Sequence, residues 1–126
     1  GWHRLTPMDG WNDATVDGSP VLNGKPVEVW ESTEDIFARL YVAHLGAMTL
    51  KEAQDWAIGA AGSSFALIES KQGDMSGTDS AGNQDWTAAF RGSDTERFAV
   101  IKTYPVAQTE HLGYALNAMA DTFTVQ

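Results

Sequence analysis

The pair Asn23-Gly24 is the sequence feature that most constrains the fold. It lies between two short apolar segments, and Asn-Gly is preferred in a type I′ turn because both central residues need a positive φ. A β-hairpin is therefore predicted at residues 21–30. Pro20 and Pro26 cannot donate ladder hydrogen bonds, which places this hairpin at the edge of a sheet.

Two helices are predicted after the hairpin. Ser32 can cap the first, over residues 33–45, because the apolar side chains there recur at helical spacing. Thr49 and Glu52 form a capping box for the second, which is expected to end at Gly62. The two helices are expected to pack against each other as a tight hairpin.

Residues 69–85 form the most polar stretch of the chain. Glycine, serine and aspartate recur through it, so a long loop is predicted, and such loops in small domains are either functional or mobile. A short strand is predicted before it, at residues 65–68. At the other end of the chain, residues 1–19 lack sustained periodicity and predict an irregular arm.

A second hairpin is predicted from residues 85–91 and 96–104. Pairing Phe90 with Phe98 places the apolar side chains on one face but sets two arginines opposite each other. A slip of one residue relieves the charges but places an arginine opposite Phe90. We expect the apolar register, because burying two phenylalanines outweighs an exposed ion pair.

A last helix is predicted after Pro105, with Thr109 as its N-cap and Leu112, Leu116 and Met119 on one face. The predicted strands and helices are grouped rather than alternating along the chain. The expected class is therefore α+β: a single domain over residues 1–126, with a small antiparallel sheet of two hairpins and a short strand packed against about three helices.

Charge and composition exclude several function classes. The chain has 17 acidic and 8 basic residues, a formal net charge of −9, which argues against direct binding of nucleic acid or of an anionic membrane. It has no cysteine, so disulfides, thiolate metal sites and cysteine nucleophiles are ruled out. No HExxH motif, calcium loop or glycine-rich phosphate loop occurs, so neither a metal nor a cofactor is expected.

The sequence says little about the compartment. No apolar run reaches the roughly 18 residues that span a membrane, and no signal peptide is visible at the first residue given. A protein in solution is expected, with the cytoplasm slightly favoured.

One hypothesis makes the chain an enzyme. Antiparallel packing of the two predicted helices would bring His44 near Glu52 or Asp55, the arrangement of an oriented general base, and Tyr41 or Ser64 could join them. The alternative is a packed histidine and a Glu52 occupied by its capping box. The balance leans against catalysis.

A second hypothesis makes the chain a small-ligand or glycan-binding module. Trp86 follows the polar stretch directly, and Arg91 and Arg97 are the only clustered bases, so together they could bind an anionic or sugar group. The simpler alternative is that Asp94 and Glu96 neutralise these arginines across the turn.

The leading hypothesis is a small acidic, non-catalytic interaction protein that binds a basic partner protein. Its sharper form is an inhibitor that mimics nucleic acid, of the kind carried by mobile elements; the simpler alternative is that the charge only maintains solubility. The residues expected to take part are the carboxylates without a local role, two tryptophans and the two arginines: Asp9, Trp11, Asp13, Asp17, Asp74, Asp79, Asp85, Trp86, Arg91 and Arg97. The oligomeric state stays open.

Overall fold

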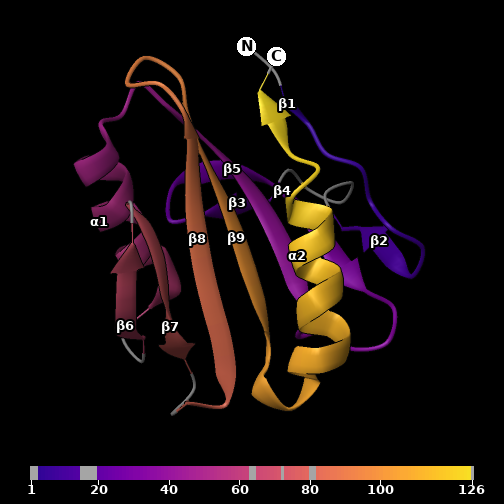
Figure 1. Ribbon diagram of the computed structural model, residues 1–126. Coiled ribbons are helices and arrows are strands. Elements are labelled where there is room, and N and C mark those ends of the chain that lie inside the picture. Colours follow the sequence, from indigo (N-terminus) through magenta and orange to yellow (C-terminus); the bar gives the residue numbers. More distant parts are fainter. Residues whose placement is uncertain (1–2, 15–19, 63–64, 72, 80–81, 126) are drawn as a thin grey trace.

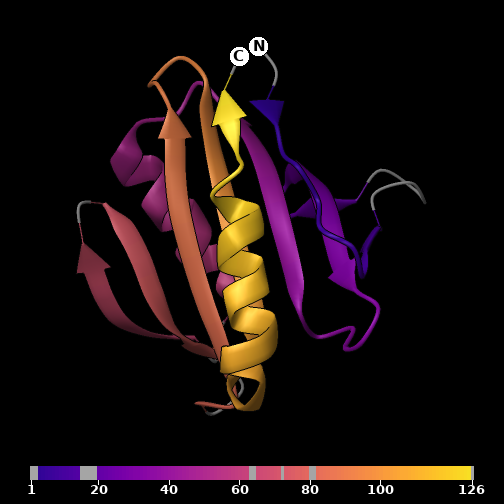
Figure 2. The same cartoon turned by 45° about the vertical axis from the view of Figure 1, so that its right-hand side comes forward.

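A large antiparallel sheet with one helix on each face dominates the structure, a computed structural model that describes residues 3–14, 20–62, 65–71, 73–79 and 82–125 (Figures 1 and 2). Its eight strands, in spatial order, are β2 (Trp11–Asp13), β4 (Lys25–Ser32), β5 (Arg39–Gly46), β9 (Arg97–Pro105), β8 (Gln84–Gly92), β7 (Asp74–Asp79) and β6 (Ala66–Lys71), with β3 (Val21–Leu22) pairing β4 beside β2.

The helices are α1 (Leu50–Ala61) and α2 (Tyr114–Ala120). A 3-10 turn (Val106–Gln108) and a π-helical turn (Thr109–Gly113) lead into α2. Two further strands, β1 (His3–Arg4) and β10 (Thr124–Val125), pair with each other and bring the two ends of the chain together (Figure 1). The predicted irregular arm therefore contributes two short strands, while its residues 15–19 lie outside the described part.

The first hairpin is confirmed. Leu22 pairs with Lys25 across a two-residue turn, and Asn23 and Gly24 have φ values of 45° and 80°, as a type I′ turn requires. The turn also holds α1: the Asn23 side chain donates to the carbonyl of Trp56 at 3.0 Å, and the Trp56 indole donates to the carbonyl of Asn23 at 2.9 Å.

The capping box of α1 is also confirmed. The Thr49 hydroxyl accepts from the Glu52 backbone N–H at 3.2 Å, and the Glu52 carboxylate accepts from the Thr49 N–H at 3.0 Å. Gly62, with a φ of 95°, follows the last helical residue. The capping box and the C-terminal glycine each act within one turn of the chain, so they do not depend on what packs against the helix.

The predicted first helix is wrong, and with it the helical hairpin: residues 39–46 form strand β5. Leu40 and Val42 point to the face covered by α2, whereas Ala43 and Leu45 point to the face covered by α1. A strand covered on both faces shows no apolar–polar alternation, and its continuous apolar run also fits helical spacing. Ser32 accepts from the Glu34 N–H at 3.0 Å within a turn instead of capping a helix.

The predicted long loop at residues 69–85 is also wrong, because most of it belongs to β6, β7 and the start of β8. Glycine, serine and aspartate are poor strand formers, and within β7 only Met75 and Gly77 are buried. Gly77 is needed there, because a Cβ would collide with the carbonyl of Ala66 and the ring of Phe65. Contacts between strands thus determine the conformation of a segment whose local propensity favours a loop.

The second hairpin forms, but in neither of the two registers considered. Phe90 pairs with Ala99 and Arg91 with Phe98, so the two phenylalanines lie on opposite faces of the sheet. Phe90 joins the core under α1, and Phe98 joins the core under α2. Residues 93–96 close the turn, with the Ser93 N–H donating to the carbonyl of Glu96 at 2.9 Å. The expected register failed because it assumed a single apolar face.

The last helix presents the predicted face, since Leu112, Leu116 and Met119 are buried against the sheet. Its start differs from the prediction: the Thr109 hydroxyl donates to the carbonyl of Val106 at 2.7 Å and caps nothing. Gly113 faces the ring of Tyr104, where a Cβ would approach the ring carbons to 3.0 Å.

The predicted α+β class, with a small sheet under about three helices, is therefore corrected to a large antiparallel sheet with two helices. Each helix covers its own apolar core, one on either side of the central strands. No helix in the described ranges has the length and hydropathy needed to cross a bilayer.

We expect Phe98→Ala to lower the free energy of unfolding by about 3–5 kcal/mol, because it removes a buried ring and leaves a cavity. Phe98 is 1% exposed, whereas Phe37 is 63% exposed. Phe37→Ala is therefore the matched control, expected to change the free energy by less than about 0.5 kcal/mol. Urea unfolding measures both, and equal losses would contradict the placement of the second core.

Candidate functional site

Three connections meet at the lower end of the sheet in Figure 1: residues 33–38 between β4 and β5, the turn between β7 and β8, and residues 106–113 between β9 and α2. Three hydrogen bonds join neighbouring connections: Gln84 Nε2 to the carbonyl of Phe37 at 2.6 Å, the Val106 N–H to the carbonyl of Asn83 at 3.0 Å, and His111 Nε2 to Glu34 Oε2 at 2.8 Å.

Carboxylates gather at this end of the molecule. Residues 33–38, 79–85 and 106–113 contain no lysine or arginine. They carry the carboxylates that, together with the connections, define what we call the acidic end: Glu34, Asp35, Asp79, Asp85 and Glu110. Asp9 lies beside it, because the Thr33 N–H donates to the carbonyl of neighbouring Gly10 at 2.9 Å.

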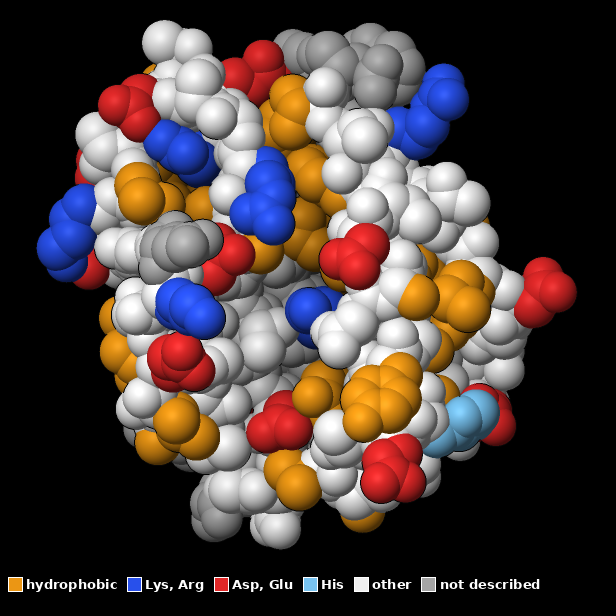
Figure 3. Space-filling view, in the orientation of Figure 1, with side chains coloured by type: hydrophobic (Ala, Val, Ile, Leu, Met, Phe, Trp, Pro, Cys, Tyr) orange, Lys and Arg blue, Asp and Glu red, His pale blue; other side chains and the backbone are white. Residues whose placement is uncertain are grey.

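Large apolar side chains are exposed among these carboxylates. Ile36 is 56% exposed and Phe37 is 63% exposed in the β4–β5 connection. Val106 and Tyr114, at 42% and 62%, follow on the other side of the sheet. The space-filling view shows acidic and apolar side chains interspersed toward this end (Figure 3). Exposed apolar groups of this size within a charged rim are typical of a protein-binding surface.

Tyr104 ties the acidic end to the sheet. Burial is the main cause that raises the pKa of its phenol, and the adjacent Asp85 carboxylate raises that pKa further. Both effects disfavour the phenolate, because burial and a nearby negative charge each oppose a second negative charge. Both causes therefore favour a neutral Tyr104 phenol beside Asp85.

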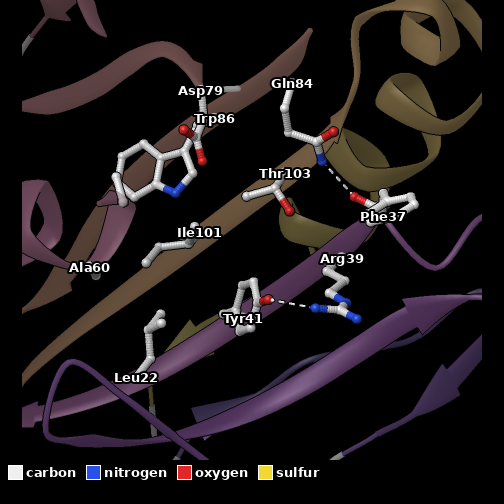
Figure 4. A pocket seen from close by; sticks show the side chains of 11 residues that line it. Leu22, Phe37, Arg39, Tyr41, Ala60, Asp79, Gln84, Trp86, Ile101 and Thr103 are labelled. Atoms are coloured by element: carbon white, nitrogen blue, oxygen red, sulfur yellow. Dashed lines mark hydrogen bonds between the residues drawn. The ribbon is translucent and has the colours of Figure 1, made fainter. Parts of the chain in front are cut away.

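A pocket of about 250 Å³ opens on the α1 face near the same end (Figure 4). Its lining divides into a polar side and an apolar side, with Trp86 and Ile101 on the apolar side and Arg39 on the polar side. Pockets near this size accept small molecules rather than side-chain clusters of a partner.

Arg39 is held by two neighbours. Its Nε donates to Glu31 Oε2 at 3.1 Å, and its Nη1 donates to the hydroxyl of Tyr41 at 3.4 Å. The Tyr41 contact, aided by the Glu31 carboxylate, outweighs partial burial and raises the pKa of Arg39. The guanidinium therefore remains charged beside the pocket.

The predicted catalytic residues are not brought together. His44 lies on β5 and packs edge-on against Phe98, with ring centroids 5.1 Å apart, on the α2 face. Glu52 and Asp55 lie on α1, on the opposite side of the sheet, where Glu52 completes the capping box and Asp55 accepts from Lys51 at 2.6 Å. Tyr41 lines the pocket, and Ser64 lies outside the described residues.

The predicted ligand-binding set is also divided. Trp86 is buried under α1, whereas Arg91 lies on the other face of the same strand, 3.6 Å from Asp74. Arg97 donates to Asp94 at 2.5 Å and to the carbonyl of Met48 at 3.2 Å. Alternation along β8 separates the tryptophan from the arginine.

The remaining predicted interaction residues are scattered. Asp9, Asp79 and Asp85 lie at or beside the acidic end, but Asp74 lies at the opposite end of β7. Asp13 is on edge strand β2, and Trp11 is half-buried against the α2 core. Asp17 lies outside the described residues.

Sequence reasoning missed Phe37, Arg39 and Tyr114, which are exposed at the acidic end or line the pocket. The sequence could have indicated Arg39 only if residues 39–46 had been assigned to a strand. The pairing of β5 with β9 then places Arg39 beside Thr103. Within the ranges described, no cluster of histidines and acids has a geometry that could hold a metal ion.

No protein-family model matches the sequence, and the curated proteins contain no match. The fold is similar to the solution structure of cyanobacterial PsbP (CyanoP) from Synechocystis sp. PCC 6803, with a TM-score of 0.65 and 12% sequence identity. The match covers 98% of this chain and 86% of that one. A likeness at this identity shows the fold alone, so function must be argued from the surface.

We expect Asp85→Asn to lower the pKa of Tyr104 part of the way toward its ordinary value of 10.0, since burial remains the larger cause. Tyrosinate absorbance measures the titration, and comparison with Tyr104→Phe identifies the part of the absorbance change that comes from Tyr104. The folded pKa is raised, so Tyr104 contributes stability below pH 10.0 that is lost as the pH rises through the folded pKa. An unchanged titration in Asp85→Asn would contradict the contact.

Proposed function

We propose that this chain is a non-catalytic binding protein that engages a basic partner protein through its acidic end. The observation that carries the proposal is the combination there of five carboxylates, no lysine or arginine in the three connections, and exposed Phe37 and Tyr114. The finer suggestion, an inhibitor that acts as a nucleic-acid mimic, is one form of this function.

Charge supports a basic partner. Near the acidic end, Arg39 is paired with Glu31, and the His111 ring lies 2.8 Å from the Glu34 carboxylate. The other carboxylates there have no lysine or arginine of their own connections to offset them. A positive surface would therefore be attracted to this end, and the attraction would raise the association rate and select among partners.

Apolar contact would supply most of the affinity. An exposed ion pair contributes about 0.2–1 kcal/mol, whereas fully burying an exposed phenylalanine or isoleucine contributes roughly 1.5–3 kcal/mol. Ile36 and Phe37 are both more than half exposed. The expected partner therefore combines basic residues with an apolar patch of its own.

The exposed aromatic rings bear on the mimic hypothesis. A nucleic-acid backbone offers phosphates and sugars to a protein, and Phe37 and Tyr114 resemble neither. A partner that only recognises phosphate would leave both rings exposed. We therefore favour a partner whose binding face is basic but includes an apolar pocket or patch.

In the decisive experiment this chain is the bait, and the protein that it captures is identified and purified. The Kd of that protein for this chain is then measured at low and at high salt. Glu34→Lys with Glu110→Lys is expected to weaken binding by about tenfold or more, because like charges then face each other. Asp55→Lys with Glu69→Lys changes the net charge equally at sites away from the acidic end, and is expected to leave binding near its original strength.

Phe37→Ala tests the apolar contribution separately. We expect it to weaken binding by about tenfold, as for an aromatic residue central to an interface, without a change in the salt dependence. Equal losses in the two charge-reversed proteins would show that net charge alone matters. Binding that both Glu34→Lys with Glu110→Lys and Phe37→Ala leave intact would refute this surface.

A further inference from the structure

The pocket on the α1 face contains an unused hydrogen-bond donor. Trp86 is 5% exposed and packs edge-on against Phe65, with ring centroids 4.9 Å apart. Its indole nitrogen turns toward the interior of the pocket (Figure 4), and no hydrogen-bond partner for it occurs among the residues the structure describes. The indole of Trp56, by contrast, donates to the carbonyl of Asn23 at 2.9 Å.

Further donors line the pocket. The Tyr41 oxygen accepts from Arg39 Nη1 at 3.4 Å, which leaves the phenolic proton available to another acceptor. Arg39 uses Nε for Glu31, so its Nη2 protons are not engaged in either contact. The Thr103 hydroxyl lies between Arg39 and Trp86 in the pocket lining (Figure 4). The polar side of the pocket thus offers donors from two adjacent strands, β5 and β9, and Trp86 adds one from β8.

Donors on the wall of a pocket favour a ligand that carries acceptors, because that ligand takes over the hydrogen bonds that water would make there. We propose that this pocket binds a small carboxylate with a flat apolar body. The carboxylate accepts from Arg39, Tyr41 and Thr103, and the body lies against Trp86 and Ile101.

The size and charge of the pocket limit the ligand. Its volume of about 250 Å³ lies below the range usual for drug-sized molecules, which restricts the body to about one ring. Asp79 also lines the pocket and repels an anion, as does Glu31 behind Arg39. The carboxylate of the ligand therefore lies beside Arg39, on the side of the pocket away from β7, because a planar guanidinium matches the geometry of a carboxylate.

Phenylacetate is a suitable probe, because it joins one flat ring to a carboxylate. Titration into the ¹⁵N-labelled protein is expected to move one indole N–H resonance saturably, and that resonance is absent from Trp86→Phe. Arg39→Gln should weaken the binding by about tenfold or more, as for a hydrogen bond to a charged group. Arg91→Gln, which removes an arginine from the other face of the sheet, should leave the binding unchanged.

Two further arms test the head group. Phenylacetamide keeps the shape and loses the charge, so it should bind about tenfold more weakly. Glu31→Gln removes a competing carboxylate from Arg39, so it should leave phenylacetate binding equal or tighter. No saturable indole shift, equal binding of the amide, or unchanged binding in Arg39→Gln would each overturn the proposal. None of these outcomes bears on the acidic end, whose test uses other residues.

Discussion

Burial of both faces of strands β5 and β9 is the constraint on which the rest of the structure depends. Val42 and Val100 pair on one face, and Ala43 and Ala99 pair on the other. Apolar surface on both sides requires two covering layers, because either face left exposed would lose the free energy of burial. The helices α1 and α2 supply these layers, and the other strands extend the sheet sideways from this centre.

The same arrangement distributes the charge. At the upper end of the sheet, acids and bases lie close together, as in the pairs of Arg97 with Asp94 and Arg91 with Asp74. At the lower end, three connections bring carboxylates together without a lysine or arginine of their own. A net charge of −9 says only that the surface is acidic, whereas the topology brings five of the 17 acidic residues, with no lysine or arginine in their own connections, to one end. That concentration, together with exposed apolar side chains, supports the proposed partner site.

The pocket depends on strand pairing in a similar way. Arg39, Thr103 and Trp86 lie on three different strands and become neighbours only because β5 pairs with β9 and β9 pairs with β8. Each side chain is ordinary in its own segment. Together they form a donor-rich pocket in a protein whose surface is otherwise acidic, and this contrast is what points to a ligand with acceptors.

The sequence by itself determined the features that depend on neighbours along the chain. The Asn23-Gly24 turn, the Thr49 and Glu52 capping box and the apolar face of α2 follow from bonds and spacings within a few residues, and all three are present. Tertiary structure alone decided the identity of β5 and β7, the register of β8 with β9, and both candidate sites. A helical pattern and a doubly covered strand look alike in one dimension, and only pairing between strands distinguishes them.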